Sequence, residues 1–166
     1  MTSESSTTAP ARPVRILEGQ AASDRAVRAL EAYFAELDER FAGGFDPALV
    51  KVADPDEVTP PRGDFILMTE LATGRVLGCG GVRVLDSGDV ELRRMWLVPD
   101  ARGRGLGRFL LRALENRARA LGGRRVVLSV NETLTEAIAL YESAGYTTTD
   151  AFEENPYVQV FLGKDL

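Results

Sequence analysis

The hydrophobic positions of the chain follow two different periods, which predict helices and strands in a definite order. Apolar residues recur every three to four positions in the segments 22–41 and 106–121, as in amphipathic helices. A glycine pair follows each segment, Gly43-Gly44 and Gly122-Gly123, and ends the helix. Short apolar runs bounded by turn residues predict strands at 14–17, 65–71, 75–84, 89–98, 125–130, 146–150 and 157–162.

A third helix is predicted after the fifth strand. The run Thr133-Leu-Thr-Glu136 has the form of a capping box and opens a helix through Tyr141 that Gly145 ends. The segment 45–61 is a mostly polar connection, with a short helix expected near 47–52. An exposed last strand could pair with the same edge of a second copy of the chain.

This order of elements predicts one mixed α/β domain over residues 14–166. Strand, helix and strand between 89 and 130 should form a right-handed parallel crossover. No internal repeat and no second domain is visible in the sequence. Residues 1–13 are rich in Ser, Thr, Pro and Ala and are expected to be a disordered tail.

The composition limits the possible catalytic chemistry, mainly because the chain has no histidine. This absence excludes Ser–His and Cys–His nucleophiles and most catalytic zinc sites, so no metal is expected. The single cysteine, Cys79, lies mid-strand between glycines and is expected to be a small core residue. Acid–base chemistry therefore has to use mainly Asp, Glu, Tyr or water.

The sequence also bears on location and partners. No apolar run reaches the roughly 18 residues that span a bilayer, and residues 1–9 lack the apolar core of a secretory signal, so a cytoplasmic protein without membrane contact is expected. The net charge of −5 argues against nucleic-acid binding. Yet the segment 102–125 holds eight arginines and one acid, which is compatible with a solvated helix face or with a site for a phosphorylated small ligand.

The start of the second long helix favours an anion site. In "ARGRGLGRFLL", residues 101–111, three glycines and three arginines precede a run of helix formers. The first N–H groups of a helix have no internal partner, and the helix dipole is positive there. The glycine spacing does not match a dinucleotide fingerprint, and no lysine is near enough for a P-loop.

Two motifs resemble a known family. Arg102-x-x-Gly105-x-Gly107 after a strand resembles the [Q/R]-x-x-G-x-[G/A] motif of the GNAT superfamily of N-acetyltransferases. The run "EAIALYESAGY", residues 136–146, resembles the end of a helix in the same family. The resemblance implies an acyl-CoA N-acyltransferase fold, with a mixed central sheet of six to seven strands flanked by helices.

The resemblance also implies a reaction. It is the transfer of an acetyl group from acetyl-CoA to a primary amine of a small molecule or peptide, directly within a ternary complex. A non-catalytic acyl-CoA-binding module is the alternative. The coenzyme pyrophosphate would be held by the loop and helix start, with these candidates: Arg102, Gly103, Arg104, Gly105, Gly107 and Arg108.

Individual roles follow from the same resemblance. Leu97 and Val98 would free backbone groups for the pantetheine arm, with one N–H polarising the thioester carbonyl. Asn131 could bond that arm, although Leu134 occupies the position of the usual family asparagine. Tyr141 would protonate the coenzyme A thiolate.

Two of these assignments have a structural alternative. Glu91 is the candidate general base, and a cross-strand ion pair with Arg83, Arg93 or Arg94 would explain it equally well. Tyr141 could also be a partly buried helix residue. A lone arginine such as Arg102 could form a surface ion pair instead of binding phosphate.

The acceptor is left open by the sequence. The acidic balance outside the basic segment is compatible with a cationic amine and equally with a solvated acidic surface. Specificity would come from residues 22–61 and the last strands. A small amine, an amino acid, an antibiotic or a protein N-terminus are all compatible, as are a monomer and a homodimer.

Overall fold

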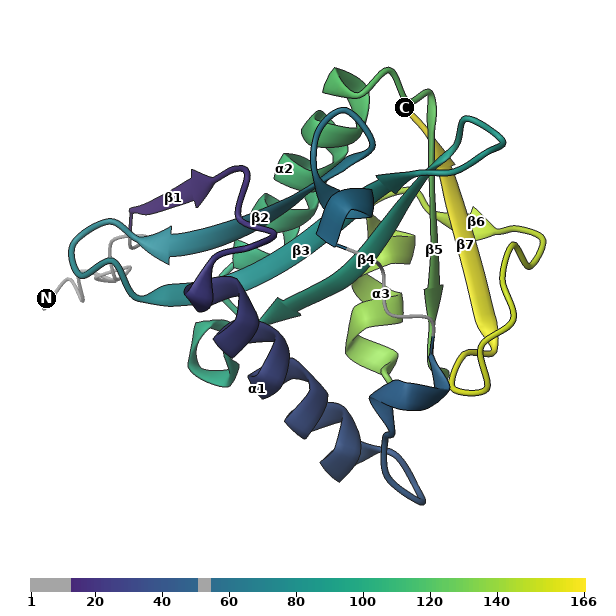
Figure 1. Ribbon diagram of the computed structural model, residues 1–166. Coiled ribbons are helices and arrows are strands. Elements are labelled where there is room, and N and C mark those ends of the chain that lie inside the picture. The colour runs from purple at the N-terminus through teal and green to yellow at the C-terminus, as the bar shows by residue number, and fades with distance from the viewer. Residues whose placement is uncertain (1–12, 51–54) are drawn as a thin grey trace, which may run out of the picture.

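Seven strands form one mixed sheet with helices on both faces (Figure 1). The computed structural model describes residues 13–50 and 55–166. The elements are β1 (Val14–Leu17), α1 (Asp24–Arg40), β2 (Gly63–Glu70), β3 (Val76–Val84), β4 (Val90–Leu97), α2 (Leu106–Ala120), β5 (Arg125–Val130), α3 (Thr135–Ser143), β6 (Thr147–Thr148) and β7 (Val160–Asp165). Short 3₁₀ turns at Pro47–Leu49, Pro55–Val58 and Pro99–Ala101 complete them.

The sheet has the order β1-β2-β3-β4-β5-β7-β6. All neighbouring strands are antiparallel except β4 and β5, which α2 connects as a parallel crossover. The predicted fold class and order of elements are therefore confirmed. The last strand, β7, is not the edge of the sheet, because it lies between β5 and β6. The tail predicted for residues 1–13 lies outside the described residues except for Pro13, whose carbonyl accepts a hydrogen bond from Leu71 N–H.

Helix α1 covers one face of the sheet. It begins at Ser23, whose side-chain oxygen accepts a hydrogen bond from Ala26 N–H and so satisfies one of the free donors of the first turn. Its buried face includes Ala26 and Ala29, which pack with Phe65 and Trp96 of the sheet. Small residues at these positions let the helix axis lie close to the strands.

Helices α2 and α3 pack on the other face, over the larger core cluster. Leu110, Leu111 and Leu114 of α2 are fully buried there. A Cβ atom on Gly80 of β3 would lie 2.6 Å from a methyl group of Leu114. Glycine at this position is therefore what allows α2 to approach β3.

A buried ion pair links α1's entry segment, the sheet and α2. Asp64 is 0% exposed; one carboxylate oxygen accepts hydrogen bonds from the N–H groups of Gly19 and Phe65, and the other accepts one from Arg117 at 2.8 Å. Removing the carboxylate would leave the Gly19 and Phe65 N–H groups without this acceptor, and Arg117 with Glu18 as its remaining carboxylate partner.

We therefore expect Asp64→Ala to lower the free energy of unfolding by about 3 kcal/mol, as for other half-broken buried pairs. Asp100→Ala is the matched control, because Asp100 pairs with Arg75 at the surface and should cost less than about 1 kcal/mol. Urea unfolding followed by the fluorescence of the single tryptophan, Trp96, measures both. Equal losses in the two variants would contradict the assignment.

Candidate active site

The cleft of the molecule begins where β4 and β5 separate. These strands pair only at Val90 with Val126 and at Glu91 with Val127. Beyond these pairs the strands diverge and enclose a cleft of about 460 Å³, which α1, α3 and the loop before α2 complete. The divergence leaves backbone groups of both strands without a neighbouring strand, so they are available to a ligand.

The loop before α2 forms one end of the cleft. Gly103 and Gly105 both have φ of 78°, a left-handed conformation that glycine adopts without steric cost. Among the described residues, no acceptor takes a hydrogen bond from the N–H groups of residues 103–108. Six consecutive donors at the positive end of a helix are therefore available, an arrangement that suits phosphate oxygens.

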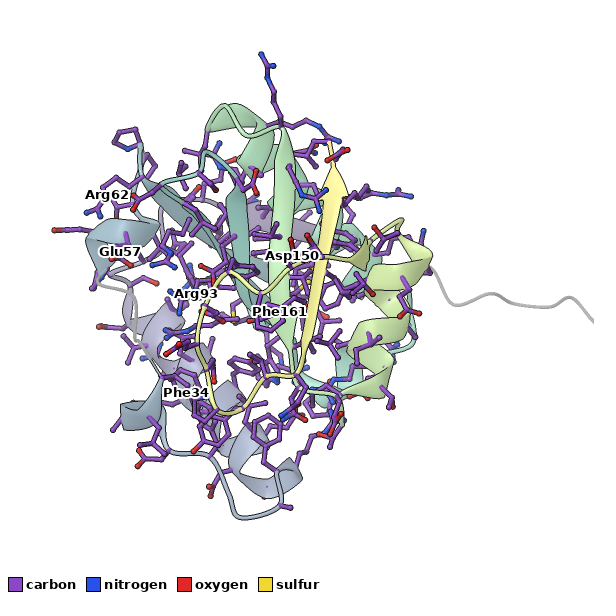
Figure 2. The ribbon with its side chains drawn as sticks, turned by 90° about the vertical axis from the view of Figure 1, so that its right-hand side faces the viewer. Phe34, Glu57, Arg62, Arg93, Asp150 and Phe161 are labelled. Carbon is purple, nitrogen blue, oxygen red and sulfur yellow. The ribbon has the colours of Figure 1, made fainter. Side chains whose placement is uncertain are left out.

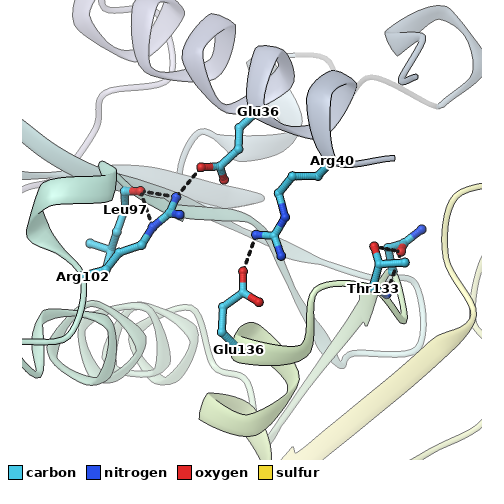
Figure 3. Close-up of polar contacts among 7 residues, drawn as sticks. Glu36, Arg40, Leu97, Arg102, Thr133 and Glu136 are labelled. Carbon is cyan, nitrogen blue, oxygen red and sulfur yellow. Dashed lines mark hydrogen bonds and ion pairs between the residues drawn. The ribbon is translucent and has the colours of Figure 1, made fainter. Parts of the chain in front are cut away.

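The three arginines predicted for this loop behave differently. Arg102 donates two hydrogen bonds to Leu97 C=O and forms an ion pair with Glu36 of α1 at 2.6 Å (Figure 3). Arg108 lines the cleft and donates to the Ser143 hydroxyl at 2.6 Å. Arg104 is exposed and does not line the cleft. The surface ion pair considered for Arg102 is thus present, and Arg108 is the loop arginine without a carboxylate partner on the cleft side.

A second ion pair crosses the cleft beside the first. Arg40 at the end of α1 pairs with Glu136 at the start of α3 (Figure 3). Together with Glu36–Arg102, it ties α1 to the opposite wall. These contacts join segments far apart in the chain, and the sequence carried no signal for either pair.

The backbone N–H groups of Leu97 and Val98 point to opposite sides of β4. The N–H of Val98 donates to Leu77 C=O at 2.8 Å and is used by β3. Successive N–H groups of a strand point to opposite edges, so Leu97 N–H points to the side on which β4 has lost its neighbour. Of the two, Leu97 lines the cleft.

Tyr141 of α3 lies at the inner wall of the cleft. Its side chain is 7% exposed, and its ring meets Tyr146 edge-on at a centroid distance of 5.8 Å. Its hydroxyl has no hydrogen-bond partner in the described parts of the chain. Burial raises the pKa of Tyr141 well above its ordinary value, so the hydroxyl keeps its proton.

Glu91 is buried on β4 within a group of charges. Its carboxylate accepts two hydrogen bonds from Arg83 and lies 3.4 Å from Arg93. The cross-strand pairing considered as an alternative is thus present. Burial still raises the pKa of Glu91, since it outweighs the opposing effect of the two guanidinium groups. The residue lines the cleft, so pairing and proximity to a ligand coexist.

Asn131 shapes the turn before α3. Its side-chain oxygen accepts hydrogen bonds from Thr133 N–H and the Thr133 hydroxyl, and its amide group donates to Tyr157 C=O. The expected capping box is wrong: the N-cap of α3 is Leu134 and makes no side-chain cap. The Thr133 hydroxyl bonds Asn131 instead, a competing local turn that an Asn two residues earlier provides. Asn131 nevertheless lines the cleft.

An aromatic cluster at the other end of the cleft was missed by the sequence analysis. Phe45 contacts Phe34, Phe41 and Tyr157 at centroid distances of 5.4, 6.0 and 4.8 Å. Phe34 of α1 and Arg93 of β4 both line the cleft (Figure 2). The spacing of Phe34 and Phe41 indicates only a helix, and the contacts of Phe41 and Phe45 with Tyr157 exist only in the folded chain.

The single cysteine of the chain is buried away from the cleft. Cys79 is 0% exposed, and burial raises the pKa of its thiol to about 12. Within residues 13–50 and 55–166, no three His, Cys, Asp or Glu side chains come together as a metal site. Over the same ranges, no helix is both long and apolar enough to cross a bilayer.

A crossover βαβ unit with split strands and an unpaired helix start is the arrangement that acyl-CoA N-acyltransferases share. Residues 30–146 match the family model described as Acetyltransferase (GNAT) family. The chain is 32% identical to an IAA acetyltransferase of Azospirillum brasilense, over 79% of this chain and 86% of that protein. The chain therefore belongs to the GNAT family of acetyltransferases.

Other relatives agree with this assignment. An uncharacterised N-acetyltransferase of Schizosaccharomyces pombe is 33% identical over 61% of this chain, a match that spans 62% of that protein. A Klebsiella pneumoniae structure assigned as an acyl-CoA N-acyltransferase superposes with a TM-score of 0.76 at 25% identity, over 94% of this chain and 99% of that one. A Salmonella typhimurium protein with acetyl-CoA as its cofactor has the same fold, with a TM-score of 0.63 at 21% identity, over 92% and 94% of the two chains.

We expect the thiol of Cys79 to be unreactive in the native protein, because the thiolate is the reactive form and burial disfavours it. An Ellman titration at pH 8 should detect no thiol in the native protein and one per chain in guanidinium chloride. Rapid stoichiometric labelling of native protein would contradict the buried position and reopen an acyl-cysteine route.

Proposed function

We propose that this protein transfers the acetyl group of acetyl-CoA to a primary amine, directly and within a ternary complex. One observation carries the proposal. The N–H groups of residues 103–108 make no hydrogen bond within the described chain, and four of these residues, Gly103, Gly105, Gly107 and Arg108, line the cleft between the separated strands that Tyr141 also lines. Such a cleft can hold an anionic coenzyme at one end and a reacting carbonyl further in.

The donor would be held mainly by backbone. The N–H groups of residues 103–108 suit a pyrophosphate, and the Arg108 guanidinium adds positive charge that no carboxylate balances. Arg102 already pairs with Glu36, so we expect it to contribute less than its place in the motif implies. Asn131 would contact the pantetheine arm from the β5 side.

Bound acetyl-CoA would supply an activated acetyl thioester. Leu97 N–H, on the open edge of β4, would donate to the carbonyl oxygen and stabilise the negative charge that develops there. The N–C bond forms as the C–S bond breaks. The amine loses a proton, and the departing thiolate gains one.

Two residues would move these protons. Tyr141 would give its proton to the thiolate: burial raises the pKa of the phenol and keeps it protonated, and the thiolate would form in the same buried surroundings, which raise its proton affinity as well. Glu91 would take the proton of the amine, because burial raises the pKa of this carboxylate and improves it as a base. The phenol is then reprotonated from solvent, which closes the cycle.

The alternative, a non-catalytic acyl-CoA-binding module, needs no proton donor in the cleft. A tyrosine that is 7% exposed, lines the cleft and has a hydroxyl without a partner in the described chain supports the enzyme instead. The acetyltransferase names of the relatives point the same way.

We expect Gly105→Val to weaken acetyl-CoA binding at least about tenfold, because a β-branched residue disfavours the left-handed backbone that aligns the N–H donors. Gly88→Val is the matched control: Gly88 has φ of 91°, equally open space around it, and a turn position away from the cleft. Calorimetric titration with acetyl-CoA, coenzyme A and NAD measures this. Absence of binding for both coenzyme A forms would contradict the proposed function.

We expect Tyr141→Phe to lower kcat by about 100-fold or more without changing the Kd for acetyl-CoA, since only the proton donor is lost. Because burial raises the pKa of Tyr141, the wild-type rate should not fall through loss of this proton below pH 10. Tyr146→Phe is the control, since this tyrosine bonds Glu115 and does not line the cleft. Equal loss of kcat in both variants would indicate a structural role.

A further inference from the structure

The aromatic end of the cleft contains a guanidinium that forms no ion pair with a carboxylate of residues 13–50 and 55–166. Arg94 of β4 is half-buried and lines the cleft, with its guanidinium carbon 5.2 Å from the ring centroid of Phe34. Its side chain forms no hydrogen bond and no ion pair with any residue the structure describes. The ring face holds the cation in place but takes none of its N–H donors.

The other cleft arginines show that this is unusual. Arg40, Arg93 and Arg102 each pair with a glutamate. Arg108, at the opposite end, donates to a hydroxyl and faces the expected phosphates. The two ends of the cleft therefore each hold one guanidinium without a carboxylate, so an anion fits at both ends.

The backbone of β4 is distorted to present Arg94. Gly81 pairs with Arg93 and Cys79 pairs with Trp96, so Arg94 and Met95 together oppose Gly80 in a β-bulge. Arg94 has φ of 53° and is the one non-glycine residue with positive φ among those described. Such strain persists where the surrounding structure imposes it and concentrates at ligand sites.

Groups beside Arg94 complete a site for a small amino carboxylate. The aromatic cluster of Phe34, Phe41, Phe45 and Tyr157 offers an apolar wall. Glu153, which accepts a hydrogen bond from the Ser129 hydroxyl, lines the same cleft and offers a negative charge to an ammonium group. The cleft has a volume of about 460 Å³, which is compatible with a free amino acid beside the pantetheine arm.

We propose that the acceptor is a free amino acid with an apolar, preferably aromatic, side chain, whose carboxylate binds the Arg94 guanidinium. This assignment rests on the proposed acetyltransferase function and names its substrate class. The guanidinium fork matches a carboxylate through two parallel N–H donors. The amine then points toward the split between β4 and β5, where Glu91 and Glu153 lie.

Binding tests the site without turnover. We expect the wild-type protein to bind 3-phenylpropionate at least tenfold more tightly than its uncharged amide in calorimetry, with coenzyme A present and absent. Arg94→Gln should bind the two compounds equally, and Arg94→Lys should keep part of the difference. Arg112→Gln is the matched control, because Arg112 is exposed on α2 and outside the cleft. Equal affinity of wild-type protein for both compounds, or equal losses in the Arg94→Gln and Arg112→Gln variants, would overturn the site.

Turnover tests the substrate class. Thiol release from acetyl-CoA should be faster with phenylalanine than with phenylalanine amide or 2-phenylethylamine. Arg94→Gln should raise KM for phenylalanine at least tenfold and leave KM for 2-phenylethylamine unchanged. A preference for the amide would overturn the proposal and favour a peptide N-terminus. Phenylpropionate binding that needs Arg94, without thiol release from any amine, would overturn the acetyltransferase but not the carboxylate site.

Discussion

The separation of β4 from β5 after two residue pairs is the constraint on which the site depends. A parallel pair that continued would bond its edges to each other and leave no room between them. Here the separated end of β4 leads directly into the beginning of the crossover, where the unbonded N–H groups of residues 103–108 lie at the start of α2. Open strand edges and an open helix start thus meet in one cleft, and both are backbone features that tolerate many side chains.

A β-bulge gives the same strand its second role. Arg94 and Met95 oppose Gly80 alone. The extra residue interrupts the regular alternation of side chains between the two faces of the sheet. Glu91 stays in a buried cluster with Arg83 and Arg93, while Arg94 turns over Phe34. The strand therefore has an available backbone N–H at Leu97 and charged side chains at Glu91, Arg93 and Arg94, nearer its start.

Helix α1 closes the cleft from the opposite face. Its ion pairs with Arg102 and Glu136 are partly exposed, and pairs of this kind contribute at most about 1 kcal/mol each. Packing of Ala26 and Ala29 against the sheet therefore positions the helix, and the ion pairs adjust its distal end. The aromatic residues of α1 therefore lie on a helix that apolar packing holds in place, while polar ion pairs line the opening of the cleft.

Periodicity, glycine placement and the Arg102-x-x-Gly105-x-Gly107 spacing are local properties, so the sequence by itself determined the order of elements, the crossover and the glycine- and arginine-rich start of α2. It also placed Tyr141 and Glu91 on elements that reach the cleft. Only the tertiary structure decided which donors and charges stay available: Val98 N–H is used by β3, Arg102 by Glu36, and Thr133 by Asn131. The aromatic wall and the unbalanced Arg94 arise from contacts between distant segments and a register shift, and no local pattern encodes either of them.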